Sequence, residues 1–136
     1  MRRLFGAVLA VPVMISGLLL VTAGPAAACS CVAEVSEAEF AANADAVFVG
    51  TLVDRIDPPQ DGMWSSADPA VLTFDVSKVY KGTVSARQQV VTPMSGASCG
   101  LELNGTGPFL VFGRAAVAEM LQPEPGQLVS YLCGGS

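Results

Sequence analysis

Four cysteines are the residues of this chain whose chemistry and spacing are most informative. Cys29 and Cys31 lie one residue apart, and Cys99 and Cys133 follow at long intervals. Zinc-binding cysteines usually come in close Cys-x-x-Cys pairs, which these gaps do not supply. An even number of cysteines in a small exported domain is typical of disulfides, so we expect two bridges, with three pairings to consider.

Cys29 and Cys31 are poorly placed to bond to each other. Residues two apart in an extended chain point the same way, whereas a disulfide needs side chains that face one another. Each must therefore reach a distant cysteine. Such bridges close loops of roughly 70 to 100 residues, for which chain entropy gives at most about 4 to 5 kcal/mol of stabilisation each.

The absence of histidine excludes several kinds of functional site. It removes the usual general base, the Ser-His-Asp and Cys-His arrangements, and the commonest metal ligand. No other nucleophile and base stand out as a pair. We therefore expect a protein that is not an enzyme and needs no cofactor.

Residues 1–28 have the pattern of a secretory signal peptide. Arg2 and Arg3 precede an apolar run over residues 4–21, and Ala26, Ala27 and Ala28 follow as a small-residue cleavage site. The alternative is a retained membrane anchor, but glycines and prolines interrupt the run. No second apolar run of that length follows, so we expect a soluble, secreted chain that begins at Cys29 and has no membrane span.

Residues 29–136 are enough for one domain with its own core and too few for two. Both signal arginines leave with residues 1–28, so five Lys and Arg face twelve Asp and Glu. A surface this acidic argues against nucleic acid as a partner. We expect one extracellular domain, and a monomer.

A short helix is predicted directly after the first two cysteines. Ser36 is a suitable N-cap, Glu39 is its capping-box partner three residues later, and Val35 is placed to pack on Phe40. The helix should cover about Glu37–Ala44. Its core-facing residues should be Ala38, Phe40, Ala41 and Ala44.

From Asp45 onward the hydrophobic period changes to two, which predicts strands. The first is "AVFVGTLVDRI", with Gly50 as a bulge or close-approach point. The second is "AVLTFDVSKVY", with Leu72, Phe74, Val76 and Tyr80 on one face, and Lys81-Gly82 ends it. Three more runs follow, "QQVVT", "PFLVFGRAAV" and "QLVSYLC", separated by turn signals such as Asn104-Gly105. Five short strands and one helix suggest a small barrel.

A long polar connection, "DPPQDGMWSSADP", separates the first two strands and holds Trp64. The favoured interpretation is a surface loop whose tryptophan packs back onto the barrel. The alternative is an exposed recognition loop with Trp64 as a contact residue. Asp57 and Asp61 match no calcium-loop spacing, so we expect solvated turn residues.

The residues around the cysteines resemble the N-terminal domain of the tissue inhibitors of metalloproteinases. Mature chains of that family begin Cys-Ser/Thr-Cys. The similarity runs through "CSCVAEVSEAEFAANADAVFVGTLV", reappears at "SGASCG" and returns in "PFLVFGR" and "LVSYLCGGS". It covers most of residues 29–136, and small exported bacterial proteins assigned by the same similarity look closer still. The resemblance implies a five-stranded OB-fold of the netrin-like type, all-β with one short helix and two disulfides.

The resemblance also implies a disulfide pairing and an inhibitory edge. It pairs Cys29 with Cys99 and Cys31 with Cys133. The amine and carbonyl oxygen of Cys29 would chelate the active-site zinc of a target metalloproteinase, so any metal contact is made only in trans. Ser30 would enter the specificity pocket of the protease and Val32 would extend the edge. A second contact would come from Gly96, Ala97 and Ser98.

Two alternatives remain for the exported domain. It is also similar to netrin-like modules that bind or support other molecules in the cell envelope and inhibit no protease. In addition, Ala26-Ala27-Ala28-Cys29 resembles a lipoprotein processing site. A lipidated Cys29 would anchor the protein at the cell envelope and would make neither the disulfide nor the zinc bond.

Overall fold

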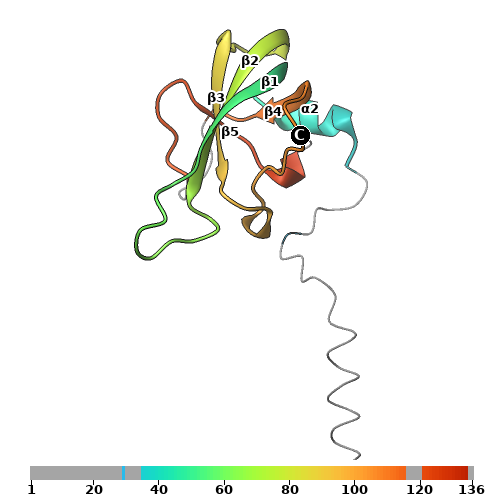
Figure 1. The fold of residues 1–136 in the computed structure, drawn as a ribbon. Coiled ribbons are helices and arrows are strands. Elements are labelled where there is room, and N and C mark those ends of the chain that lie inside the picture. The colour runs from blue at the N-terminus through green and yellow to red at the C-terminus, as the bar shows by residue number, and fades with distance from the viewer. Residues whose placement is uncertain (1–28, 30–34, 116–120, 135–136) are drawn as a thin grey trace, which may run out of the picture.

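The chain forms a curled five-stranded sheet with one short α-helix beside it (Figure 1). The computed structural model describes residue 29 and residues 35–115 and 121–134. The elements are α2 (Glu37–Asn43), β1 (Ala46–Ile56), β2 (Pro69–Lys81), β3 (Arg87–Pro93), η1 (Gly96–Ser98), β4 (Phe109–Gly113), β5 (Leu128–Val129) and η2 (Leu132–Gly134). The predicted fold class, mostly β with one short helix, is confirmed. Among the described residues, no helix has the length and apolar character needed to cross a membrane.

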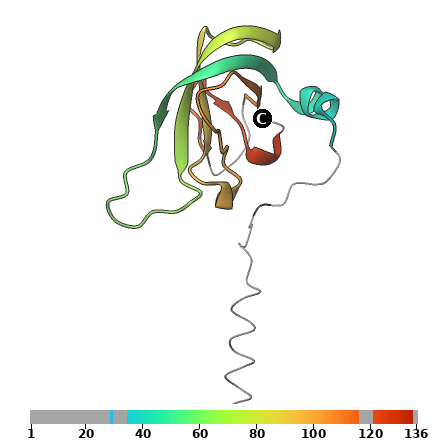
Figure 2. The same ribbon diagram turned by 45° about the vertical axis from the view of Figure 1, so that its right-hand side comes forward.

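The sheet has the strand order β4-β1-β2-β3-β5 and closes on itself at one point. All neighbouring strands are antiparallel except β3 and β5, which pair in parallel through Val90 with Leu128 and Val91 with Val129. Arg114, just after β4, exchanges backbone hydrogen bonds of 2.9 and 2.8 Å with Val129. Because this contact joins the two outer strands, the sheet curls into a small barrel-like shape (Figure 2).

Strand β1 has the predicted bounds, and Gly50 plays the predicted role. The β1–β2 register shifts between Val49 and Gly50. A Cβ atom at Gly50 would lie only 3.0 Å from the Cβ of Phe74. The bulge and the missing side chain let the long, bent strands approach closely enough to enclose a core.

Aromatic and aliphatic side chains from every side of the sheet fill its interior. Phe48 and Phe74 are fully buried and their rings meet edge to face at 5.9 Å. Complete burial of one such side chain contributes about 1.5 to 3 kcal/mol, so the cluster stabilises the fold substantially. The other buried members of the cluster are Ala46, Leu72, Val90, Leu101, Val111 and Leu128.

Helix α2 begins as its capping box predicts. The Ser36 hydroxyl accepts a hydrogen bond from the Glu39 amide at 3.3 Å, and the Ser36 amide donates to the Glu39 carboxylate at 3.0 Å. Phe40 packs at 6.1 Å from Phe112 on the outside of the sheet. At the other end, Lys81 Nζ donates to the carbonyls of Ala41 and Ala42 at 2.8 and 3.0 Å, which ties the helix to the end of β2.

Two local predictions were wrong, each because tertiary structure overrode a local pattern. Ala38 is exposed, since the helix lies across a shallow surface that reaches only Phe40, Ala41 and Ala44. The last predicted strand is only Leu128–Val129, and η2 replaces its end so that Cys133 turns toward Cys29. In β2, Tyr80 is 59% exposed, because the end of this strand extends beyond the part of the sheet that encloses the core.

Candidate functional site

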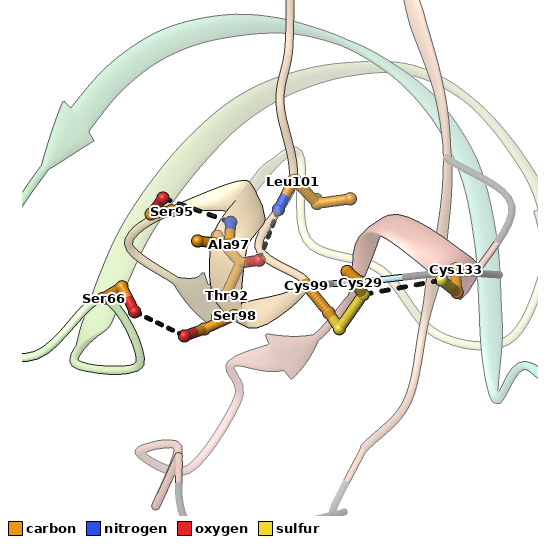
Figure 3. Close-up of a disulfide and its surroundings, with 9 residues drawn as sticks. All are labelled: Cys29, Ser66, Thr92, Ser95, Ala97, Ser98, Cys99, Leu101 and Cys133. Atoms are coloured by element: carbon orange, nitrogen blue, oxygen red, sulfur yellow. Dashed lines mark hydrogen bonds between the residues drawn. A yellow bond between two sulfur atoms is a disulfide. The ribbon is translucent and has the colours of Figure 1, made fainter. Parts of the chain in front are cut away.

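A disulfide joins Cys29 to Cys99 and places the first residue of the predicted mature chain beside η1 (Figure 3). The two Cα atoms are 5.4 Å apart across a sequence separation of 70 residues. Cys99 directly follows η1 (Gly96–Ser98), which consists of the three residues predicted for the second part of the inhibitory edge. This pairing, implied by the resemblance, is confirmed, and Cys29 lies near η1 as expected.

The other predicted edge residues, Ser30, Cys31 and Val32, lie outside the described residues. Their placement and the pairing of Cys31 with Cys133 therefore remain predictions. Cys133 Sγ lies 3.8 Å from Cys29 Sγ, so the sulfur atoms of Cys29, Cys99 and Cys133 form a cluster. All three cysteines are half-buried.

Local hydrogen bonds explain why the chain turns sharply at η1. The Ser95 hydroxyl accepts from the Ala97 amide at 3.3 Å, and the Cys99 amide donates to the Gly96 carbonyl at 3.0 Å. Cys99 itself adopts the left-handed conformation, with φ of 64°. Gly100 follows against the Pro93 carbonyl, where any Cβ atom would overlap the carbonyl oxygen. The turn therefore fixes the Cys99 side chain toward Cys29.

A buried hydrogen bond supports this turn from below. The Thr92 hydroxyl accepts from the Leu101 amide at 2.9 Å, and both residues are almost completely buried. A backbone bond also links the turn to η2, since the Leu132 amide donates to the Cys99 carbonyl at 2.8 Å. The relative position of Cys99 and Cys133 is thus set partly by backbone contacts.

The connection between β1 and β2 packs against the same turn. The hydroxyls of Ser66 and Ser98 are 2.6 Å apart, and the Ser95 amide donates to the Ser66 carbonyl at 3.2 Å. At the end of β1, just before this connection, Arg55 Nη2 donates to the Met94 carbonyl at 2.8 Å. The sequence gives no local signal for this contact, because serines in a polar loop have no pattern that names their partner.

The tip of this connection is exposed. Met63 is fully exposed and Trp64 is 53% exposed. The prediction that Trp64 packs back onto the barrel is therefore wrong, and the alternative of an exposed loop describes its position. Figures 1 and 2 show this connection, in green, projecting away from the sheet.

The three residues of η1 beside Cys29 are uncharged. These are Gly96, Ala97 and Ser98, and the side chain of Glu102 lies against Gly96. In the part of the chain that the structure describes, no three His, Cys, Asp or Glu side chains are grouped to hold a metal ion. The arrangement can present a fixed Cys29 and a short turn to a partner.

No protein-family model matches this chain, and no curated protein sequence matches it significantly.

Proposed function

We propose that residues 29–136 form a secreted inhibitor of a zinc metalloproteinase, of the type found in tissue inhibitors of metalloproteinases. The observation that carries the proposal is the Cys29–Cys99 disulfide, which holds the predicted mature N-terminus beside η1. An inhibitor that acts through its own N-terminus needs this residue fixed before binding. Two contacts, the N-terminus and η1, then reach the same partner together.

The proposed mechanism depends on the free amine of Cys29. After signal cleavage, the amine nitrogen and carbonyl oxygen of Cys29 ligate the zinc of the protease, whose catalytic site keeps an open position. An α-amine has a pKa of about 7.7 to 8.0 in model compounds, so it loses its proton readily when it binds zinc. Ser30 enters the specificity pocket, and Val32 and residues 96–98 extend the contact. The disulfide lowers the ordering cost of association.

The topology supports an OB-fold of the netrin-like type as the finer description of the fold. A five-stranded OB-fold is a partly open barrel. The strand order β4-β1-β2-β3-β5, the parallel β3–β5 pair and the closing contact at Arg114 agree with such a barrel. We also propose the second bridge, Cys31–Cys133. It is supported by the 3.8 Å approach of Cys133 to Cys29, two residues from Cys31.

An N-terminal extension tests the mechanism. One alanine added before Cys29 should abolish inhibition in a panel of zinc metalloproteinases, because the amine is displaced from the zinc. The matched control carries the same alanine after Ser136 and should inhibit like the native protein. Equal thermal midpoints would show that both variants are folded. Equal inhibition by both would overturn zinc chelation.

A second candidate is a binding module of the cell envelope that inhibits no protease. The observation in its favour is the fully exposed Met63 next to Trp64, on a loop that packs against η1. Here Trp64→Ala should weaken capture of an envelope component, while the N-terminal extension has no effect. A lipid anchor on Cys29 is less favoured, because the lipid would occupy the sulfur that bonds to Cys99.

A further inference from the structure

Three cysteine sulfurs are close enough to exchange partners. Cys29 Sγ is bonded to Cys99 Sγ and lies 3.8 Å from Cys133 Sγ. A disulfide bond is about 2.05 Å long, so a Cys29–Cys133 bond needs an approach of less than about 2 Å. Figure 3 shows Cys29 between Cys99 and Cys133, so a thiolate at Cys133 would approach Cys29 from the side away from its present partner.

Backbone contacts keep the sulfurs together whichever bond is present. The Leu132 amide donates to the Cys99 carbonyl at 2.8 Å, which holds η2 against the end of η1. The Thr92–Leu101 bond holds the other side of the turn. Reduction of one bridge would therefore leave a thiol beside the remaining disulfide. This proximity is the condition for fast thiol–disulfide exchange.

We propose that the disulfides at this cluster exchange, and that the exchange is a redox switch for the position of Cys29. The proposal rests on the second bridge assigned above to Cys133. In the first step an external dithiol reduces that bridge, becomes a cyclic disulfide itself and leaves two protein thiols. In the second step the Cys133 thiolate attacks Cys29 Sγ, the Cys29–Cys99 bond breaks, and Cys99 leaves as a thiolate that takes up the released proton. The second step involves no net oxidation or reduction.

The exchange would detach Cys29 from η1 without releasing it from the domain. Cys29 would be fixed to η2 instead, and the two parts of the proposed inhibitory edge would no longer be held side by side. Because all three cysteines are half-buried and not enclosed, a small dithiol can reach them. The thiol of Cys99 would remain next to the new bond, so the same chemistry can run backward.

Replacement of Cys31 tests the exchange directly. In Cys31→Ser the proposed partner of Cys133 is removed, so the Cys133 thiol is left facing the Cys29–Cys99 bond. After acid quenching and alkylation with N-ethylmaleimide, peptide mapping should recover both Cys29–Cys99 and Cys29–Cys133, each as at least about a tenth of the protein. Ser30→Ala, which keeps all four cysteines, is the control and should map like the native chain. Recovery of Cys29–Cys99 alone, with Cys133 alkylated, overturns the proposal.

Limited reduction of the native protein provides the test if Cys31→Ser does not fold. Brief treatment with dithiothreitol should produce a one-disulfide species that carries Cys29–Cys133 and alkylated Cys99. A one-disulfide species that keeps only Cys29–Cys99 overturns the exchange. Peptide mapping of the native protein before reduction also tests the first step. If the native chain has no Cys31–Cys133 bridge, that step is ruled out. These measurements need no target protease, so they test the exchange independently of the inhibition assay.

Discussion

The Thr92 hydroxyl accepts a hydrogen bond from the buried amide of Leu101, at 2.9 Å, across the base of the turn that carries Cys99. Thr92→Val keeps the shape of the side chain but leaves this amide without its acceptor. We expect unfolding in urea to show a loss of about 1 to 3 kcal/mol. Thr51→Val makes the same change at an exposed position of β1 and should be nearly neutral. Equal effects of both changes would contradict the role of the buried bond.

Removal of the Cys29–Cys99 disulfide should have the largest effect on stability. The bond closes a 70-residue separation, for which chain entropy gives a loss of about 4 kcal/mol. The double change Cys29→Ala and Cys99→Ala removes the bond without leaving a thiol from either residue. Its thermal midpoint should fall by many degrees, which is further than the midpoint of any single surface variant falls. An unchanged midpoint would mean that the bridge does not constrain the unfolded chain.

Gly82 ends β2 in a conformation that other residues adopt poorly. Its φ is +76°, and a Cβ atom there would overlap the Asp45 carbonyl oxygen. Gly105 has a similar φ of +81° but nothing within 4 Å of such an atom. Gly105→Ala should therefore cost only the conformational strain, about 1 to 2 kcal/mol, and Gly82→Ala should cost clearly more in a urea titration. Equal losses of stability in the two variants would mean that the backbone at Asp45 can move away from the added methyl group without cost.

The capping box of α2 should make stability depend on pH. Hydrogen bonds from Ser36, first from its amide and then from its hydroxyl, hold the pKa of Glu39 below the ordinary value of 4.5. A lowered pKa means that the charged carboxylate stabilises the folded state above pH 4.5 and that this contribution is lost as the pH falls through the folded pKa. Native protein and Glu39→Gln should differ in unfolding at pH 7 and converge in acid. A difference that does not change with pH would contradict the prediction.

Proposed inhibition should weaken in acid because the Cys29 amine must lose a proton. Below the amine pKa of about 7.7 to 8.0, the apparent inhibition constant should rise about tenfold per pH unit. The measurement is inhibition of one susceptible metalloproteinase from pH 5.5 to 8.5. A control inhibitor that binds the same zinc without an amine corrects for titration of the protease. Parallel profiles for both inhibitors would argue against the amine as a ligand.

Elements with strong local signals were predicted well from the sequence. The capping pair Ser36 and Glu39 located the helix start, and the apolar run from Ala46 gave the bounds of β1. The alternation in β2 did not indicate that Tyr80 is exposed, since no residue near it in sequence shows where the core ends.

The candidate site was predictable only where a chemical motif marked it. Cys29, Cys99 and residues 96–98 were predicted to lie together because the Cys-Ser-Cys motif and "SGASCG" carry the resemblance described above. The contact between Ser66 and Ser98 depends on two loops that meet only after folding, and neither serine differs from a solvated one in sequence. Cys29 and Cys133 also come close together only after folding, because η2 forms where a longer strand was predicted.

The separation of 70 residues between Cys29 and Cys99 also sets an order of events during synthesis. A chain made from its N-terminus contains Cys29 long before Cys99, with all of β1, β2 and β3 in between. Cys29 precedes every strand and yet is fixed to the domain only after the first three strands exist. Until then it has no disulfide to Cys99, so the site is completed late in the making of the chain.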